Sequence, residues 1–218
     1  MAHAARALQL FGFNYACQLS VRVKLVSTEV YMSATSVLKR LFTVKEYYLM
    51  YESGVFANGE RVELIRGEII KMAAIGRRHA ACVDRCNDVF AYKLGKEVLI
   101  RIQNPLALDN TSEPEPDVLL LKRKADFYES GHPRPADVFL LIEVADSTID
   151  SDRELKIPLY AEDGITEVWL IDINSACIEV YRNPTAEGYQ DIQKFYRGQN
   201  LSILAFSDLS ITVDEILG

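Results

Sequence analysis

The sequence predicts a mixed α/β protein in which one core is formed by a central sheet flanked by helices. Apolar runs of strand length alternate with segments of helical character, and the last forty residues favour strands. The chain has 218 residues, of which 49% are hydrophobic and 25% charged. This is the composition of a globular chain that can bury one sizeable core.

The first predicted elements are a helix, a hairpin and a second helix. They span residues 43–51, 62–72 and 77–94. Thr43 is a candidate N-cap, and Glu46 follows three residues later as in a capping box. The dipeptide Arg66-Gly67 indicates a tight bend between two short strands. Gly95 is expected to end the second helix.

The second half predicts strands, one helix and an antiparallel pair. The expected strands span residues 98–102, 116–121, 138–145, 167–172, 177–182 and 189–194, with residues 105–108 as a further candidate. Ser151 to Glu154 has the pattern of a capping box that begins a helical turn. Pro158 then either kinks this helix or occupies its first turn, and Gly164 ends it.

The amino-terminal segment differs in charge from the rest. Residues 1–31 contain three basic residues and one acid, although the whole chain has a net charge of -7. Met32 would serve as an alternative start. We therefore expect residues 1–41 to be an extension outside the functional fold, and residues 42–218 to form the functional domain.

The overall charge argues against a broad basic surface for nucleic acid. It does not exclude a nuclease, because metal-binding acids add negative charge that bound cations neutralise. The four cysteines form no CxxC pair, so we interpret them as reduced thiols in a cytoplasmic protein. No apolar run approaches the ~20 residues that span a bilayer, and the start of the chain lacks a convincing secretory signal. No membrane association is expected.

Two acids in apolar runs predict a metal site. Glu143 lies inside the run Val138 to Ala145, where an unpartnered carboxylate would cost many kcal/mol unless paired, protonated or metal-bound. Asp117 opens a second apolar run and can share the Glu143 face on a neighbouring strand. Mg²⁺ is usually bound by one or two carboxylates with water and phosphate, and the Val144 carbonyl could supply a further ligand.

Lys156 is the candidate cation for this site. It follows Glu143 at the start of the next helix, and the small side chain of Ala145 leaves space on the Glu143 face. It would orient water or stabilise the charge that develops on phosphate. Taken alone, a lysine at a helix start is usually solvated, and a buried glutamate is also explained by a structural ion pair.

Candidates for substrate binding are basic residues and one histidine. Arg78 and Lys122 belong to short basic runs that could contact a phosphate backbone, and a solvated loop explains them equally well. His79 begins a helix and could line the cleft.

Several motifs in order resemble a known group of nucleases. They are Glu63 to Glu68, His79, Glu115 to Val118, Ile142 to Ser147, Asp152 to Lys156 and Tyr160 to Asp172. This string is similar to the Uma-two (Uma2) family of bacterial endonucleases, also called domain of unknown function 820, within the PD-(D/E)XK restriction-endonuclease-like superfamily. The resemblance covers residues 42–215.

The resemblance implies a restriction-endonuclease-like fold and Mg²⁺-dependent hydrolysis of DNA phosphodiester bonds, with Mn²⁺ as an alternative ion. Asp117 and Glu143 would hold the ion, and Glu63 would be a third acid. The superfamily pattern places lysine two residues after the glutamate, where this chain has Ala145. Family members supply that lysine from the next helix, which indicates Lys156.

Other functions remain open from the sequence. A non-catalytic DNA- or partner-binding module could keep this fold without turnover, and a metal phosphohydrolase of small nucleotides would suit the low positive charge. A homodimer would bring two sites to two DNA strands, but no sequence feature demonstrates one. The presence or absence of DNA cleavage with Mg²⁺ or Mn²⁺ separates an enzyme from a binding module.

Overall fold

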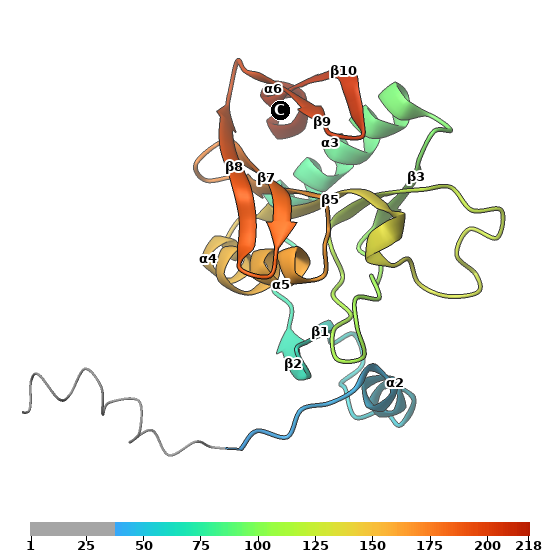
Figure 1. Ribbon diagram of the computed structural model, residues 1–218. Coiled ribbons are helices and arrows are strands. Elements are labelled where there is room, and N and C mark those ends of the chain that lie inside the picture. The colour runs from blue at the N-terminus through green and yellow to red at the C-terminus, as the bar shows by residue number, and fades with distance from the viewer. Residues whose placement is uncertain (1–37) are drawn as a thin grey trace, which may run out of the picture. The chain divides into compact units, whose positions relative to one another are not determined.

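A six-stranded mixed sheet is the central element of residues 38–218, the part of the chain that this computed structural model describes (Figure 1). The expected extension over residues 1–41 lies, up to residue 37, outside the described residues. Residues 41–218 form one compact unit. The strand order is β3-β4-β5-β6-β7-β8, in which only β5 and β6 are parallel.

The strands of this sheet have the following bounds: β3 Leu99–Ile102, β4 Val118–Leu121, β5 Val138–Ala145, β6 Glu167–Asp172, β7 Cys177–Thr185 and β8 Gly188–Tyr196. Two small antiparallel pairs lie outside it, β1 Val62–Ile65 with β2 Glu68–Lys71 and β9 Asn200–Ile203 with β10 Phe206–Thr212. The α-helices are α2 Val44–Glu52, α3 Arg77–Leu94, α4 Ile149–Ser151, α5 Ile157–Glu162 and α6 Val213–Leu217, and a short 3₁₀ helix spans Pro135–Asp137.

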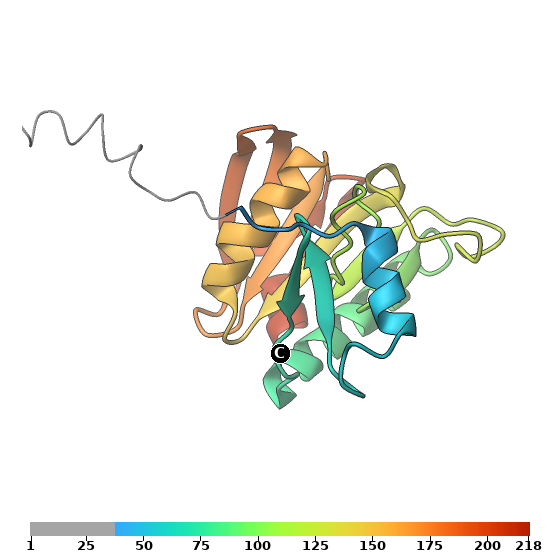
Figure 2. The same ribbon diagram turned by 90° about the horizontal axis from the view of Figure 1, so that it is seen from below.

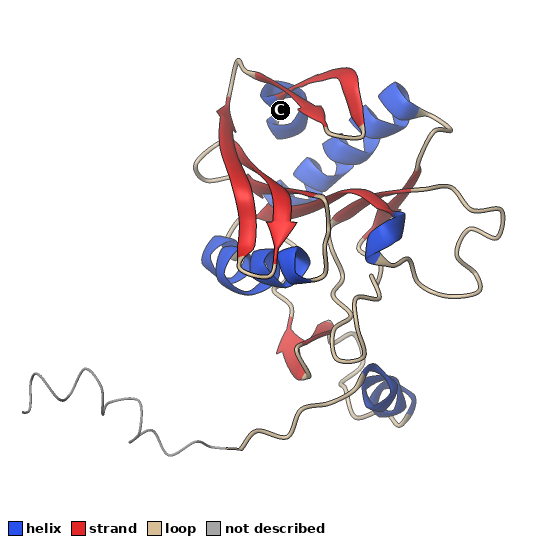
Figure 3. Ribbon diagram, viewed as in Figure 1, coloured by secondary structure: helices blue, strands red, loops and turns tan. Residues whose placement is uncertain are grey.

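Helices cover both faces of the sheet. Figures 1 and 3 show α3 and α6 on one face, and Figure 2 shows α4 and α5 crossing the other. Alternation along the strands divides their side chains between two buried clusters. Val118, Ile142 and Trp169 belong to the cluster under α3, whereas Leu141 and Leu170 belong to the cluster under α5. The predicted α/β layering is therefore confirmed, with a core on each face instead of one.

Local sequence signals set the first elements as expected. The Thr43 hydroxyl accepts the Glu46 amide and the Glu46 carboxylate accepts the Thr43 amide, which completes the predicted capping box of α2. Arg66 and Gly67 both adopt positive φ in the turn from β1 to β2. A Cβ on Gly67 would lie 2.6 Å from the Leu41 Cβ, so this turn requires glycine for space as well as conformation.

The helix after β5 differs from the expectation. It begins at Ile149, so the Ser151–Glu154 pattern lies inside the helix and is not its cap. The segment Asp152–Lys156 forms a π-helical turn, in which the Ile157 amide donates to the Asp152 carbonyl five residues earlier. Pro158 accounts for this irregularity, because proline lacks the donor and clashes with the carbonyl four residues before it.

Other predicted strands shift or disappear. Residues 105–108 form no strand, although Leu106 and Leu108 are buried. The strand expected from residue 116 starts at Val118, and β7 and β8 extend further than predicted. No described helix has the length and apolar character needed to cross a membrane.

Candidate metal-dependent active site

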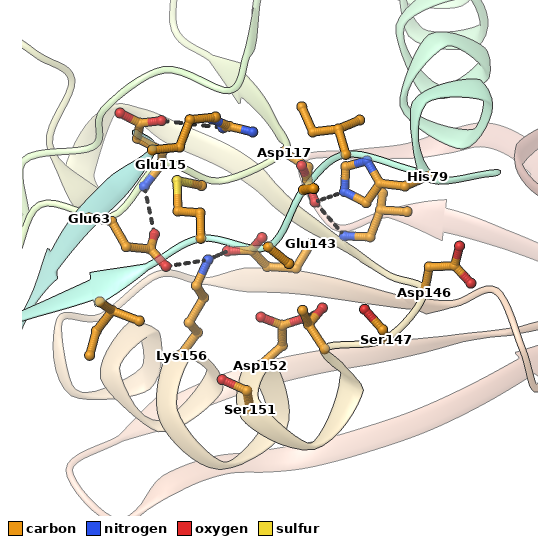
Figure 4. A pocket seen from close by; sticks show the side chains of 18 of the residues that line it. Glu63, His79, Glu115, Asp117, Glu143, Asp146, Ser147, Ser151, Asp152 and Lys156 are labelled. Atoms are coloured by element: carbon orange, nitrogen blue, oxygen red, sulfur yellow. Dashed lines mark hydrogen bonds and ion pairs between the residues drawn. The ribbon is translucent and has the colours of Figure 1, made fainter. Parts of the chain in front are cut away.

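A cavity of about 330 Å³ opens where the β1–β2 hairpin, the start of α3 and the π-helical turn meet the strands β4 and β5 (Figure 4). Acids dominate its described lining. The carboxylates are Glu63, Glu115, Asp117, Glu143, Asp146 and Asp152, and the lysines and arginines are Arg61, Lys71 and Lys156. The excess of carboxylates gives this cavity, called the carboxylate cavity below, an electrostatic field that favours cations.

Asp117 and Glu143 face the same side of the sheet. Val118 lies opposite Ile142 in the antiparallel pair β4–β5, and continuing this register by one residue places Asp117 opposite Glu143. Directly opposed residues share a face at about 5 Å between their Cα or Cβ atoms. The fold thus brings together the two acids on which the metal prediction depends.

Three donors surround the Asp117 carboxylate. Its Oδ2 accepts from the Val144 amide at 2.9 Å and bonds the His79 Nε2 at 3.0 Å, and its Oδ1 accepts from the Gln103 side chain at 3.0 Å. Burial alone would raise the pKa of Asp117, but these hydrogen bonds outweigh it and hold the pKa below its usual value. Asp117 therefore stays ionised near neutral pH, as a metal ligand must.

His79 reaches the site through that same contact. Its hydrogen bond with Asp117 raises the pKa of the imidazole, against the opposing effect of burial. The other ring nitrogen, Nδ1, is buried and has no hydrogen-bond partner among the described residues. His79 thus lines the cavity beside Asp117, and its contact with substrate stays a prediction.

Glu143 has one occupied and one available oxygen. Its Oε1 accepts from the Tyr160 hydroxyl at 2.6 Å and from Lys156 Nζ at 3.3 Å, whereas Oε2 accepts no hydrogen bond from the described residues. Burial raises the pKa of the Glu143 carboxyl to about 8, although the charge of Lys156 opposes this. A divalent ion at Oε2 would reverse the shift, because a cation stabilises the ionised form.

Lys156 joins the two halves of the site. Its ammonium pairs with Glu63 Oε1 at 3.0 Å and with Glu143 Oε1 at 3.3 Å (Figure 4). Burial alone would lower the pKa of Lys156, but the carboxylates around it raise the pKa above its usual value. The lysine from the following helix therefore reaches the site and remains charged. Ala145 is buried among apolar side chains of the α5 face.

The donor set fits a magnesium-type ion. Among residues 38–218 no three His, Cys, Asp or Glu side chains are already arranged as a closed metal site. Mg²⁺ does not need one, because it is commonly held by one or two carboxylates and completes its octahedron with water and phosphate oxygens. Asp117 and Glu143 would supply those carboxylates on one face of a polar, open cavity.

Three sequence candidates make contacts other than the predicted ones. Val144 contacts Asp117 through its amide, and a role for its carbonyl stays a prediction. Arg78 lies outside this cavity, where it bonds Asp146, a residue of the cavity wall. Lys122 donates to the Ala136 carbonyl at the far end of β4, roughly 17 Å of strand away from Asp117. Its contact with substrate also stays a prediction.

Four lining or supporting residues were not among the predicted site residues. Gln103 donates to Asp117 twice, from its side chain to the carboxylate and from its backbone N–H to the backbone carbonyl. Its backbone has a φ of 51°. Tyr160 donates to Glu143, and the Glu115 amide donates to Glu63. Asp152, which falls within the predicted capping box, lines the cavity and accepts from Thr148. The signal for Tyr160 was available, since it falls four residues after Lys156 on the same helical face.

A solved structure has the same fold as this chain. One match is a crystal structure described as a "putative nuclease belonging to DUF820" from Anabaena variabilis ATCC 29413. The TM-score is 0.62 and the sequence identity 17%, over 81% of this chain and 97% of that chain. At this identity the likeness establishes the architecture, a central mixed sheet flanked by helices. No curated protein matches the sequence.

A family model gives the assignment. The model of the Uma2 family, described as "Putative restriction endonuclease", matches residues 44–214. That range contains the hairpin with Glu63, the strands with Asp117 and Glu143, and the π-helical turn with Lys156. The chain therefore belongs to the Uma2 family.

Proposed function

We propose that this protein is a divalent-metal-dependent endonuclease that hydrolyses DNA phosphodiester bonds in the carboxylate cavity. The single observation that carries the proposal is the convergence of Asp117, Glu143 and Lys156 in one cavity from three separate segments. Membership of the Uma2 family supports the same class of reaction. Mg²⁺ is the proposed ion, and Mn²⁺ is expected to replace it.

Asp117 and Glu143 would hold the ion. When bound there, a divalent cation would polarise the phosphate and lower the pKa of bound water. Asp117 is suited to its role because its three donors keep it ionised and fixed. Glu143 is suited because its Oε2 accepts no hydrogen bond from residues 38–218.

Lys156 supplies positive charge and not a base. Its raised pKa means that it carries a proton throughout the neutral range. A charged ammonium can donate to the phosphate oxygens and stabilise the negative charge that grows on them. Glu63 accepts from the same ammonium and thereby fixes the direction in which Lys156 points. Tyr160 restrains Glu143 in a comparable way.

The proposal is tested by cleavage of supercoiled and linear DNA with Mg²⁺ or Mn²⁺, using purified full-length protein. Asp117→Asn and Glu143→Gln are expected to lower the cleavage rate about 10³-fold or more, because each removes a metal ligand. Glu187→Gln, in the exposed turn between β7 and β8, is the matched control and should cleave normally. Circular dichroism verifies that the variants fold.

The absence of cleavage of any DNA form by the unaltered chain, with either ion, would contradict the proposal. Normal cleavage by Asp117→Asn or by Glu143→Gln would remove the assignment of the site. Binding without cleavage would instead favour the non-catalytic DNA-binding module.

A further inference from the structure

A second cavity, of about 440 Å³, lies next to the carboxylate cavity and has the opposite charge. Four arginines line it, contributed by the first half of α3 and by the turn after β8: Arg77, Arg78, Arg85 and Arg197. The other described residues of its wall are uncharged: Ala81, Cys82, Ile173 and Leu217. In a chain with a net charge of -7, this gathering of arginines is a local reversal of sign.

The two cavities adjoin at the start of α3. Gly76 lines the carboxylate cavity and Arg77, the next residue, lines the arginine cavity. Arg78 spans the boundary, because its guanidinium bonds Asp146 of the first cavity while its side chain lines the second. A chain-like ligand in one cavity could therefore extend into the other.

Two of the arginines are held in place by the protein. Arg78 bonds Asp146, Asn174 and the Ile173 carbonyl, and Arg197 bonds Asp214 and the Gly218 carbonyl. These contacts consume part of their charge and position the walls. They make Arg78 and Arg197 poor sites for a clean test, since their removal would also disturb the structure.

The other two arginines keep their charge for a ligand. Among the described residues the arginine cavity's ion pairs belong to Arg78 and Arg197, and neither Arg77 nor Arg85 forms one. The Arg85 guanidinium lies close to Gly218. Arginine presents planar donors that match phosphate oxygens in pairs, and its weak hydration lowers the cost of binding them. The chemistry of the cavity is that of a phosphate site.

We propose that the arginine cavity binds a backbone phosphate of the nucleic acid whose neighbouring phosphodiester lies in the carboxylate cavity. This inference rests on the proposed function for its ligand, but it concerns binding and not hydrolysis. The division of labour follows from the charges. The carboxylate cavity repels a bare phosphate until a cation enters, so attraction of the strand must come from a site beside it.

The test is DNA binding by fluorescence anisotropy, with a labelled duplex and full-length protein in EDTA, at a series of salt concentrations. Arg77→Gln is expected to weaken binding roughly tenfold at low salt, the loss of one charge-assisted contact. The slope of log affinity against log salt should fall by about 1 for Arg77→Gln and about 2 for Arg77→Gln with Arg85→Gln. Arg77→Lys, which keeps the charge, should restore most of the affinity.

Lys96→Gln is the matched control. It removes the same charge from an exposed position just beyond the other end of α3, roughly 28 Å along the helix from Arg77. It should change the affinity less than twofold and leave the slope unaltered. Equal effects of Arg77→Gln and Lys96→Gln would overturn the proposal, because they would show only a general loss of charge.

Cleavage and binding fail independently in this design. If the unaltered chain shows no affinity for DNA at low salt, the arginine cavity is not a backbone site, while the separate cleavage assay still decides the proposed hydrolysis. If DNA binds with the expected arginine dependence but is not cut, the cavity inference stands and the endonuclease proposal falls.

Discussion

Two buried acids of the same sheet, on strands that β6 separates, have opposite electrostatic states. Glu179 on β7 accepts from Arg153 and Tyr181 and pairs with Lys194. Burial alone would raise the pKa of Glu179, but these partners lower it to about 2. Glu143 on β5 has one cation, shared with Glu63, and burial raises its pKa to about 8.

The difference separates an acid that is satisfied from an acid that awaits a ligand. Glu167 on β6 resembles Glu179, because Arg182, the Trp169 indole and the Leu204 amide all donate to it. Neither Glu167 nor Glu179 lines the carboxylate cavity. Burial of an acid is therefore a poor indicator of function by itself. The informative feature is a buried acid with too few donors at the wall of a cavity.

Replacing a buried glutamate by glutamine should give the largest difference between Glu143 and an acid with enough donors, such as Glu167. Glu143→Gln should lower cleavage about 10³-fold without destabilising the fold, since a neutral amide avoids the cost of ionising a buried carboxyl and Lys156 keeps Glu63 as a partner. Glu167→Gln should do the reverse and cost about 3 kcal/mol, because Arg182 loses its buried counter-ion. Urea unfolding and the rate per folded molecule measure the two effects. If both variants changed the cleavage rate and the free energy of unfolding in the same way, the distinction between the two kinds of buried acid would fail.

Removing a lysine that pairs with Glu143 or with Glu179 should give the next largest difference in cleavage rate. Lys156→Met should lower cleavage about 10²- to 10³-fold, because the ammonium that stabilises developing charge is lost. Lys194→Met removes a half-exposed partner of Glu179 and should leave the rate unchanged, with a stability loss of at most about 1 kcal/mol. Steady-state cleavage rates with saturating Mg²⁺ compare the two. Full activity of Lys156→Met would show that the lysine only stabilises the fold.

The metal-free protein should show the contrast in its dependence on pH. A folded pKa of about 2 against the ordinary 4.5 means that Glu179 stabilises the fold above pH 4.5 and that this stability is lost as the pH falls toward 2. Glu143, with a folded pKa of about 8, stabilises the fold below pH 4.5 and loses that contribution as the pH rises through 8.

Urea unfolding in EDTA across this range tests both signs. Glu179→Gln should flatten the acid limb of the stability profile, and Glu143→Gln should flatten the limb between pH 4.5 and 8. If Glu143→Gln instead left the neutral limb as steep as in the unaltered chain, its carboxyl would not have the raised pKa on which the comparison rests.

The sequence predicted the positions of most elements because local signals determined them. The capping box at Thr43, the bend at Arg66 and the apolar run around Glu143 each depend on residues that are close in the chain. The π-helical turn was not foreseen. Its cause, Pro158, was visible, but whether a proline kinks, begins or π-bulges a helix depends on tertiary packing.

The site was predictable only in part, for a related reason. Asp117 and Glu143 stand out as acids in apolar runs, so burial reveals them in the sequence. Gln103 has no such signal, because its role follows from a left-handed backbone position next to Asp117. The arginine cavity likewise joins α3 to the turn after β8, which no local pattern connects.

The smallest expected effect concerns the π-helical turn that connects Glu179 to Glu143. Arg153 and Lys156 lie on the same π-helical turn, and Arg153 bonds Glu179 while Lys156 bonds Glu143. The contact between Arg153 and Glu179 thus holds in place the segment that carries Lys156, the proposed catalytic lysine. Arg153→Gln should reduce the cleavage rate only about threefold to tenfold, because a misplaced group loses part of its benefit while chemistry and metal ligands remain.

A positioning role predicts a specific pattern for Arg153. The apparent affinity for DNA should not change, since Arg153 does not line either cavity described here, and the loss should appear in kcat alone. Glu179→Gln should produce a similar loss, because it breaks the same contact from the other side. When both substitutions are combined, the effect should be no larger than either alone, as expected for two partners of one interaction. Additive losses would mean that Arg153 and Glu179 act on the site by separate routes.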